Sequence, residues 1–413
     1  MRVLFTSPIL EHPPAGGPQL RIENSIKALS RVCELFVVSR ASRHSVGKSG
    51  EALYRSLSKG FYYVPAVASN RYVRRVRRIL RRPAVVDETE SSARFVLDLA
   101  TELDIDILWF GYGNISFPLI KRIKETMPSL KVVCDTDSVW SRFVLRELPF
   151  QTDPVKRAAI ERDGRAKAAE EQAWVDLCEI TTAVSEVDAD YYRSIADDPG
   201  RIQIFSNAID VHQYETTPPP PADLSHPCMY LAGTFGRYDS PMDVAGRWVL
   251  EEVLPRVREQ VPDIRFYIVG RDSQKSFGDI TDPAVIVKGK LPSVLPYLCH
   301  ADVALVPLKF ESGTRFKILE AGACGIPLVS TILGAEGLPV VDNEHIVLAD
   351  DPERFAQAIV RIVNDRPFAG RIADNCRELV RERYSVESLS REAAHILEMF
   401  SASGGGTWSE RRS

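Results

Sequence analysis

Short apolar runs alternate with longer amphipathic stretches along most of the chain. The short runs are rich in β-branched residues and end at turn residues, which is typical of strands, while the longer stretches repeat their apolar positions with a helical period. This alternation predicts parallel α/β layers. Strands are expected at 2–8, 34–40, 106–112, 131–136 and 179–185, and again at 229–235, 265–271, 285–290, 302–308, 327–332 and 345–349. The clearest helical patterns cover 21–31, 155–176, 244–261, 314–324 and 386–400.

The two series of strands are separated by a proline-rich segment at 216–227, in which four prolines follow one another. Consecutive prolines cannot continue a helix or a central strand, so this segment is expected to be a stiff connector. A chain of 413 residues also exceeds one ordinary domain. We predict Rossmann-like domains at 1–210 and 228–385, joined by a linker at 211–227. The Gly/Ser-rich residues 401–413 are expected to be disordered.

Two doubly wound domains joined in this way are expected to face each other across a central cleft. Ligands of such folds bind at the carboxyl ends of the strands, where helix N-termini can receive phosphate.

Composition narrows the choice of partners and compartment. The formal net charge of −4 argues against a general nucleic-acid partner. Seven scattered cysteines without CxxC spacing indicate free thiols in a reducing compartment, and the histidines show no metal-ligand spacing. No apolar run approaches the roughly 18–20 residues of a membrane span. We therefore expect a cytoplasmic protein without a bound metal.

The most informative segment is 311–331, directly after the expected strand at 302–308. Ser312, Gly313 and Thr314 form a loop of small residues that opens a helix. The N–H groups and positive dipole end of a helix start suit a diphosphate.

Three side chains on this helix add to the pattern. Arg315 and Lys317 place positive charge in the first turn, where a departing nucleotide diphosphate needs stabilisation. Glu320 lies farther along the helix and can accept hydrogen bonds from ribose hydroxyls. The alternative is an ordinary strand–loop–helix with a surface glutamate.

In this segment and others the sequence resembles the family-4-like GT-B glycosyltransferases, nearest a bacterial exopolysaccharide-associated subgroup. The matching segments are 16–21, 185–192, 205–210, 231–235, 268–272, 289–310 and 314–331. The resemblance implies a retaining transferase of hexosyltransferase type that uses a nucleotide-diphosphate sugar, of UDP or GDP type, without an obligatory metal or other cofactor. It also implies that the first domain binds the acceptor, that the second binds the donor, and that the helix at 386–400 crosses back to the first domain.

The family's motifs carry over residue by residue. Glu320 matches the second glutamate of an E-x7-E element, the ribose contact, whereas the first glutamate is replaced by Ser312. Gly16 and Gly17 match an N-terminal glycine loop, where a Cβ would obstruct phosphate, although an ordinary turn is also compatible with a Gly-Gly pair.

The family often carries an Arg and a Lys after the first strand of the second domain. Here Arg237 is present without the lysine, and Arg271 follows the next strand. Both are candidate diphosphate ligands, with solvated loop arginines as the alternative.

Asp137 occupies the place where many relatives have a histidine near the transferred sugar. A carboxylate there could orient a sugar or accept a proton. The alternatives are a helix N-cap from Asp137 or Ser138, or a metal-binding DxD pair with Asp135, as in GT-A enzymes. We take Asp137, Arg237, Lys317 and Glu320 as candidate catalytic residues.

Seven arginines at 71–82 accompany apolar residues at helical spacing. Such a basic helix could rest on the inner membrane face or bind a phosphorylated or lipid-linked acceptor. A solvated charged face is the alternative.

The function that best unites these features is sugar transfer from a nucleotide-diphosphate donor to a glycan, lipid-linked or small-molecule hydroxyl. The alternatives are a sugar-nucleotide epimerase on the same fold and a nucleotide-binding module without turnover.

Overall fold

The computed structural model describes residues 1–14, 16–65 and 88–402. The chain forms two compact units, and neither is one continuous segment. The first contains Met1–Asp137, Lys167–Ser206 and the described residues from Leu389 onward, and the second contains Ser138–Ala166 and Asn207–Ser388. The basic segment predicted at 71–82 and nearly all of the predicted tail at 401–413 lie outside the described residues.

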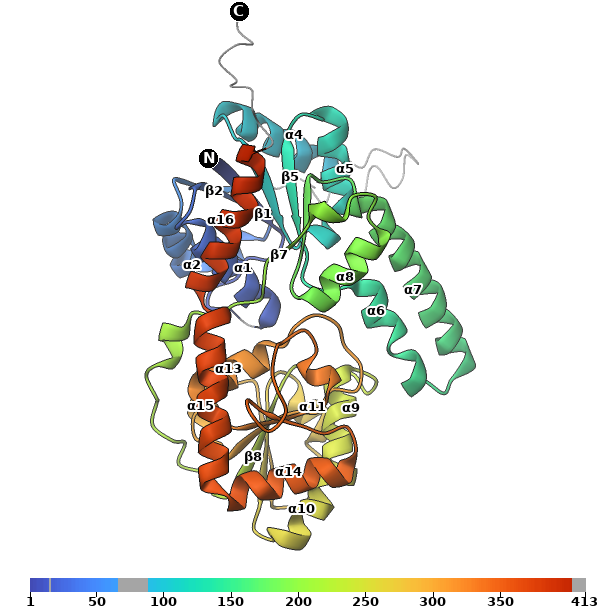
Figure 1. The fold of residues 1–413 in the computed structure, drawn as a ribbon, viewed down its shortest axis with the longest axis vertical. Coiled ribbons are helices and arrows are strands. Elements are labelled where there is room, and N and C mark those ends of the chain that lie inside the picture. Colours follow the sequence, from blue (N-terminus) through green and yellow to red (C-terminus); the bar gives the residue numbers. More distant parts are fainter. Residues whose placement is uncertain (15, 66–87, 403–413) are drawn as a thin grey trace, which may run out of the picture. The chain divides into compact units, whose positions relative to one another are not determined.

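The first unit is built on a parallel sheet of seven strands in the order β3-β2-β1-β4-β5-β6-β7 (Figure 1). The strands are β1 Arg2–Ser7, β2 Glu34–Ser39, β3 Gly60–Tyr63, β4 Ile107–Gly111, β5 Lys131–Asp135, β6 Ile180–Ala183 and β7 Ile202–Ile204. β4 is buried along its whole length, and only the first residue of β1 is exposed, which is the pattern of strands covered on both faces. The five strands predicted in this half are confirmed, whereas the short strands β3 and β7 were not predicted.

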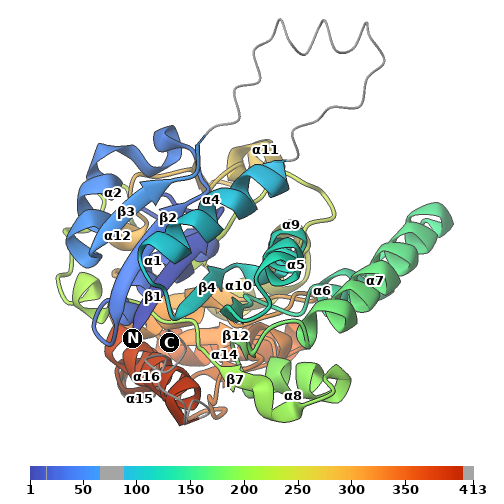
Figure 2. The same ribbon diagram turned by 90° about the horizontal axis from the view of Figure 1, so that it is seen from above.

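Helices connect these strands and cover the sheet. They are α1 Gly17–Leu29, α2 Arg43–Leu57, α4 Glu88–Glu102, η1 Gly113–Ile115, α5 Phe117–Thr126, α8 Glu186–Ile195 and η3 Pro199–Arg201. Figure 2 shows α4 and α5 side by side. The last helix, α16 Val386–Ala402, contributes its residues from Leu389 onward to the same unit. There Glu392 accepts hydrogen bonds from the N–H and the hydroxyl of Ser206, at 2.7 and 2.8 Å.

The second unit contains a parallel sheet of six strands in the order β10-β9-β8-β11-β12-β13. The strands are β8 Cys228–Ala232, β9 Arg265–Val269, β10 Val285–Gly289, β11 Val303–Val306, β12 Leu328–Ser330 and β13 Val347–Leu348, as predicted. Its other elements are η4 Val211–Tyr214, α9 Pro241–Trp248, η5 Val249–Val253, α10 Leu254–Gln260, α11 Ser273–Phe277, α12 Leu295–Leu298, α13 Phe316–Cys324, η6 Leu333–Ala335, α14 Pro352–Asn364 and α15 Arg366–Arg383. Two doubly wound parallel sheets confirm the predicted α/β class.

The segment between β5 and β6, two strands of the first sheet, begins in the second unit and ends in the first. It comprises α6 Trp140–Leu145, η2 Leu148–Phe150 and α7 Pro154–Val175, with Lys167 the first residue of α7 in the first unit. The helix predicted at 244–261 is divided by the π-helical turn η5. Pro255 lies just after this turn and has no N–H to donate, so a regular α-helix cannot be continued there without losing a hydrogen bond.

A buried ion pair anchors the carboxyl edge of the first sheet. Arg21, on α1, is 2% exposed and donates to Asp135 at the end of β5, which is 0% exposed. The same guanidinium donates to the carbonyl groups of Phe205 and Ser206, at 3.0 and 3.2 Å. The hydroxyl of Thr182 donates to Asp135 at 2.9 Å. One buried cation therefore joins α1, β5 and the segment after β7.

Replacing Arg21 by Met is expected to lower the free energy of unfolding by about 3–5 kcal/mol, because the buried Asp135 carboxylate loses its counter-ion. Urea unfolding would measure the loss. The double variant Arg21→Met/Asp135→Leu should regain much of it, since no unpaired charge remains. Arg122→Met is the control, because Arg122 pairs with Glu90 at 2.6 Å but is 43% exposed. A loss no larger than that of Arg122→Met would contradict the argument.

Candidate active site

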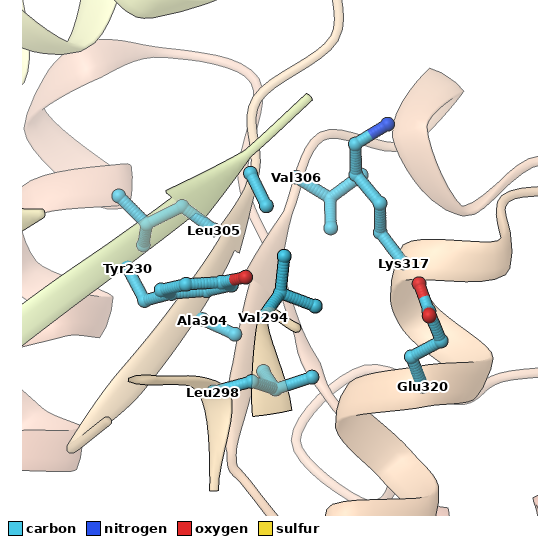
Figure 3. Close-up of a pocket in the computed structure, with 9 residues that line it drawn as sticks. Tyr230, Val294, Leu298, Ala304, Leu305, Val306, Lys317 and Glu320 are labelled. Atoms are coloured by element: carbon cyan, nitrogen blue, oxygen red, sulfur yellow. The ribbon is translucent and has the colours of Figure 1, made fainter. Parts of the chain in front are cut away.

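A cavity in the second unit is lined by β8 and β11, the paired strands at which the strand order of the sheet reverses, and by the segments of α12 and α13. Ligands of doubly wound sheets bind at such reversal points. The cavity holds about 330 Å³ of empty space, including its open mouth. Its lining comes from β8, β11, α13 and the segment around α12, and consists of Tyr230, Ala232, Val294, Leu298, Ala304, Leu305, Val306, Lys317 and Glu320 (Figure 3).

The loop that leads from β11 into α13 is held from within. Gly313 has a φ of 77°, a backbone conformation that favours glycine. Arg315 occupies the N-cap position of α13 and turns back into the loop, where it donates to the carbonyl groups of Ser312 (2.7 Å) and Gly313. Asn207 donates to the hydroxyl of Thr314 at 2.8 Å. The backbone at the start of α13 is therefore fixed before any ligand arrives.

A second arginine, directly after α6, supports this loop and was not singled out from the sequence. Arg146 donates to the carbonyl of Glu311 at 2.7 Å. It also forms a bidentate pair with Glu336, at 2.6 and 2.8 Å. These contacts span 165 and 190 residues of sequence. No local pattern reveals such a partnership.

Glu320 and Lys317 line the cavity from successive turns of α13 and are both half-buried. Figure 3 shows the Lys317 ammonium extending along the wall, away from Glu320. Burial raises the pKa of Glu320, although the Tyr214 hydroxyl, 3.2 Å from its Oε1, and Lys317 both oppose this shift. Burial likewise lowers the pKa of Lys317. A carboxylate with one oxygen held by Tyr214 can offer the other to hydroxyl groups of a ligand.

Arg237 and Arg271 lie on neighbouring loops at the carboxyl edge of this sheet, outside the cavity lining. Both are exposed, and Arg237, with 80% side-chain exposure, has Asp239 at 3.8 Å. The Phe235 N–H donates to the Arg271 carbonyl at 2.9 Å, so the two loops are tied together by backbone.

In the first unit, Gly16 directly precedes α1, and Gly17 is the first residue of this helix. Gly16 is the N-cap of α1, with an extended φ of 177° and no side-chain cap. A Cβ placed on it would meet Gln19 Oε1 at 3.5 Å and Pro18 Cδ at 3.9 Å, which are ordinary contacts. The packing of the unit therefore does not itself require glycine at position 16.

Asp137 follows β5 at the same edge of the first sheet and is half-buried. Asn114, which the sequence did not suggest, donates to its Oδ1 at 2.7 Å. The cap interpretation was wrong in its position, because the N-cap of α6 is Val139. The structure also speaks against the DxD interpretation, since Asp135 is 0% exposed and already pairs with Arg21.

The described residues bring three metal-ligating side chains together elsewhere, with His226, Cys228 and Asp302 donor atoms within 4.8 Å of one another. Asp302 already accepts from Arg366 at 2.8 Å, and burial raises the pKa of the Cys228 thiol to about 12. A protonated thiol beside a satisfied ion pair is a poor metal site. None of the described helices is both long and apolar enough to cross a lipid bilayer.

Comparisons with known proteins agree with this geometry. Residues 230–365 match the family model "Glycosyl transferases group 1". Over 311 residues the chain is 23% identical to the GDP-mannose-dependent alpha-(1-6)-phosphatidylinositol monomannoside mannosyltransferase of Mycolicibacterium smegmatis, covering 70% of this chain and 74% of the relative. It is 28% identical over 186 residues to the phosphatidyl-myo-inositol mannosyltransferase of Mycobacterium leprae, covering 41% of this chain and 46% of that protein.

Solved structures share the fold across nearly the whole chain. Anabaena HepE, in complex with UDP and glucose, superposes with a TM-score of 0.65 at 14% identity, covering 97% of this chain and all (100%) of that one. Sucrose-phosphate synthase from Thermosynechococcus elongatus gives a TM-score of 0.65 at 16% identity, covering 98% and 100%. These neighbours confirm the predicted GT-B fold.

Removing Arg146 should loosen the loop before α13. Arg146→Ala is expected to lower the free energy of unfolding by about 1–2 kcal/mol, because a bidentate, charge-assisted pair and a carbonyl contact are lost. Urea unfolding would measure this. Arg162→Ala removes an exposed arginine that pairs with the neighbouring, exposed Asp163 at 3.0 Å, and should cost much less. Equal costs would contradict a supporting role for Arg146.

The pKa of Glu320 predicts a pH dependence of stability. Because its pKa is raised in the folded state, Glu320 contributes stability that is fully present below the unfolded pKa and lost as the pH rises through the folded pKa. The Glu320→Gln side chain carries no charge at any pH. The Tm of this variant should therefore rise relative to the Tm of wild type as the pH increases from about 4 to about 8. Thermal unfolding across this range tests it, with exposed Glu344→Gln as control. A Tm difference independent of pH would contradict the assignment.

Proposed function

We infer that this chain, a group 1 glycosyltransferase with the GT-B fold, transfers a sugar from a nucleotide-diphosphate donor to a hydroxyl group of an acceptor. The observation that carries the proposal is the cavity at the strand reversal of the second sheet. It joins a carboxylate, Glu320, and an amine, Lys317, to the preformed loop at the start of α13. The family model matches this same part of the chain.

The donor is a nucleotide sugar of UDP or GDP type. Glu320 receives the ribose hydroxyls, and the backbone at Gly313 and Thr314 faces the diphosphate at the N-terminus of α13. Lys317, with Arg237 and Arg271 at the same sheet edge, supplies the positive charge. Two comparisons support this donor class: the M. smegmatis relative is named for GDP-mannose, and the HepE structure holds UDP and glucose.

We assign Arg315 a different role from the other cations. Its guanidinium is buried and donates to carbonyl groups of its own loop. It therefore shapes the diphosphate-binding backbone. Ser312, in the place of the family's first glutamate, offers a hydroxyl toward the donor and no charge.

The reaction proceeds with retention and without a required metal. The bond between the anomeric carbon and the diphosphate oxygen breaks, the acceptor oxygen attacks from the same face, and its proton passes to the departing phosphate. Lysine, arginine and backbone N–H groups stabilise the charge that develops on the diphosphate. Asp137, held by Asn114, orients a sugar, and Gly16 and Gly17 allow close approach of a ligand to the backbone of the first unit.

The acceptor is a glycan or a lipid-linked molecule. The two mycobacterial relatives are named for phosphatidylinositol-based acceptors, which supports an acceptor at the membrane surface. Contact of residues 71–82 with a cytoplasmic membrane face remains a prediction, because these residues lie outside the described structure.

The decisive experiment is a thermal unfolding shift with UDP, GDP, ADP and dTDP, each with and without Mn²⁺. We expect one diphosphate, without metal, to raise the Tm. A nucleotide present at about 100 times its dissociation constant should raise the free energy of unfolding by about 2.7 kcal/mol. Glu320→Ala should abolish most of the shift, whereas exposed Glu344→Ala should retain it.

The outcomes separate the alternatives. No shift with any nucleotide, or a shift that requires Mn²⁺ and ignores Glu320, overturns the proposal. With the matching nucleotide sugar, sugar transfer requires an acceptor, whereas nucleotide release with isomerised sugar and no acceptor would indicate an epimerase. Tight nucleotide binding without any turnover would indicate a binding module.

A further inference from the structure

Tyr230 is the polar residue of the cavity that the proposed chemistry does not use. It lies in β8 and is 5% exposed. Its hydroxyl is buried and forms no hydrogen bond with any described residue. Figure 3 shows the ring within the cavity, with the hydroxyl directed toward the side where α13 carries Glu320 and Lys317.

The packing of the unit does not account for this hydroxyl. A buried hydroxyl without a partner costs free energy, and a phenylalanine would fill the same space without that cost. Native proteins pair nearly all of their buried polar atoms, so an unpaired one at the wall of a cavity points to a partner supplied by a ligand.

The surroundings of Tyr230 suit one part of the donor. Val294 and Leu298 line the cavity with apolar side chains, and Ala304, Leu305 and Val306 of β11 continue this surface. Apolar walls complement the faces of a flat heterocycle. Glu320 lies at the same cavity, within reach of an attached ribose. Burial and the nearby Glu320 charge raise the pKa of Tyr230, so its hydroxyl is a neutral donor at physiological pH.

We propose that the Tyr230 hydroxyl donates a hydrogen bond to a carbonyl oxygen on the edge of the donor's uracil or guanine base, and thereby determines base specificity. This inference rests on the proposed function, because it assigns the base end of the same donor site. Adenine has no carbonyl oxygen, so an adenine nucleotide would leave the hydroxyl poorly matched in a buried position, which is how a polar pocket rejects a ligand that lacks the expected group.

The test compares wild type with Tyr230→Phe by calorimetric titration of UDP, GDP and ADP. We expect the variant to bind the preferred nucleotide about 5- to 10-fold more weakly, the effect of one lost hydrogen bond. The affinity for ADP should change little. The ratio of the affinity for the preferred nucleotide to the affinity for ADP should therefore fall by the same factor of about 5 to 10. The Tm of the unliganded variant should equal or exceed that of wild type, because an unpaired hydroxyl is removed.

Tyr297→Phe is the matched control. Tyr297 is also buried in the second unit, but its hydroxyl donates to Asp223 Oδ1 at 2.8 Å. Its loss should lower the Tm and leave the ratio of UDP or GDP to ADP affinity unchanged. This contrast separates a ligand contact from a general effect on folding.

Each outcome decides the matter. If wild type binds none of the nucleotides, the proposed function fails and the Tyr230 inference fails with it. If wild type binds but Tyr230→Phe shows the same affinities and the same base preference, the proposed function stands and the Tyr230 inference is overturned. A uniform loss of affinity for all three nucleotides would also overturn it, because the Tyr230 hydroxyl would then not distinguish one base from another.

Discussion

The site depends on one constraint, which is that every strand of both sheets runs parallel to its neighbours. Parallel strands end at the same edge, so the loops that follow them gather there whatever their separation in sequence. In the second unit this places the loops after β8, β9 and β11 together. In the first unit it places the segments after β1 and β5 together. Most of the candidate functional residues accordingly lie in the segments that follow strands, and few lie within a strand.

Within this frame, the loop at the start of α13 is held in shape by side chains that bind its carbonyl groups and the Thr314 hydroxyl. Arg315 binds the carbonyl groups of residues 312 and 313 from within the loop, Asn207 fixes Thr314, and Arg146 holds the carbonyl of Glu311. A backbone whose shape is already set does not have to be ordered by the ligand, which lowers the entropic cost of binding. Arg315 and Arg146 thus bind carbonyl groups of this loop and hold its backbone in place.

Periodicity alone predicted most of the architecture. A strand such as β4 is visible because both of its faces are buried, so four of its five residues are large apolar ones. β3 and β7, of four and three residues, were not predicted, although the equally short β12 was. The break at η5 was missed because Pro255 lies within an otherwise continuous helical pattern, and periodicity does not register a lost N–H donor.

The candidate site was predictable where chemistry and local sequence coincide, as for the loop 312–314 and for Lys317 and Glu320 on one helix. It was not predictable where partners come from distant segments. Arg146 with Glu311, Asn114 with Asp137, and Tyr214 with Glu320 are joined only by the fold. Tyr230 could not be identified from the sequence for another reason. In the sequence it is one aromatic residue in an apolar strand, and only the structure shows that its hydroxyl lies at a cavity.

The discontinuous first unit has a consequence for biosynthesis. Its sheet is complete once β7 has been made, yet Glu392, which binds Ser206 just after β7, is translated 186 residues later. At about 5–20 residues per second, the growing chain must wait on the order of ten seconds or more for that partner. During this interval the entire second sheet emerges. The first unit is therefore the earlier to begin folding and the later to finish.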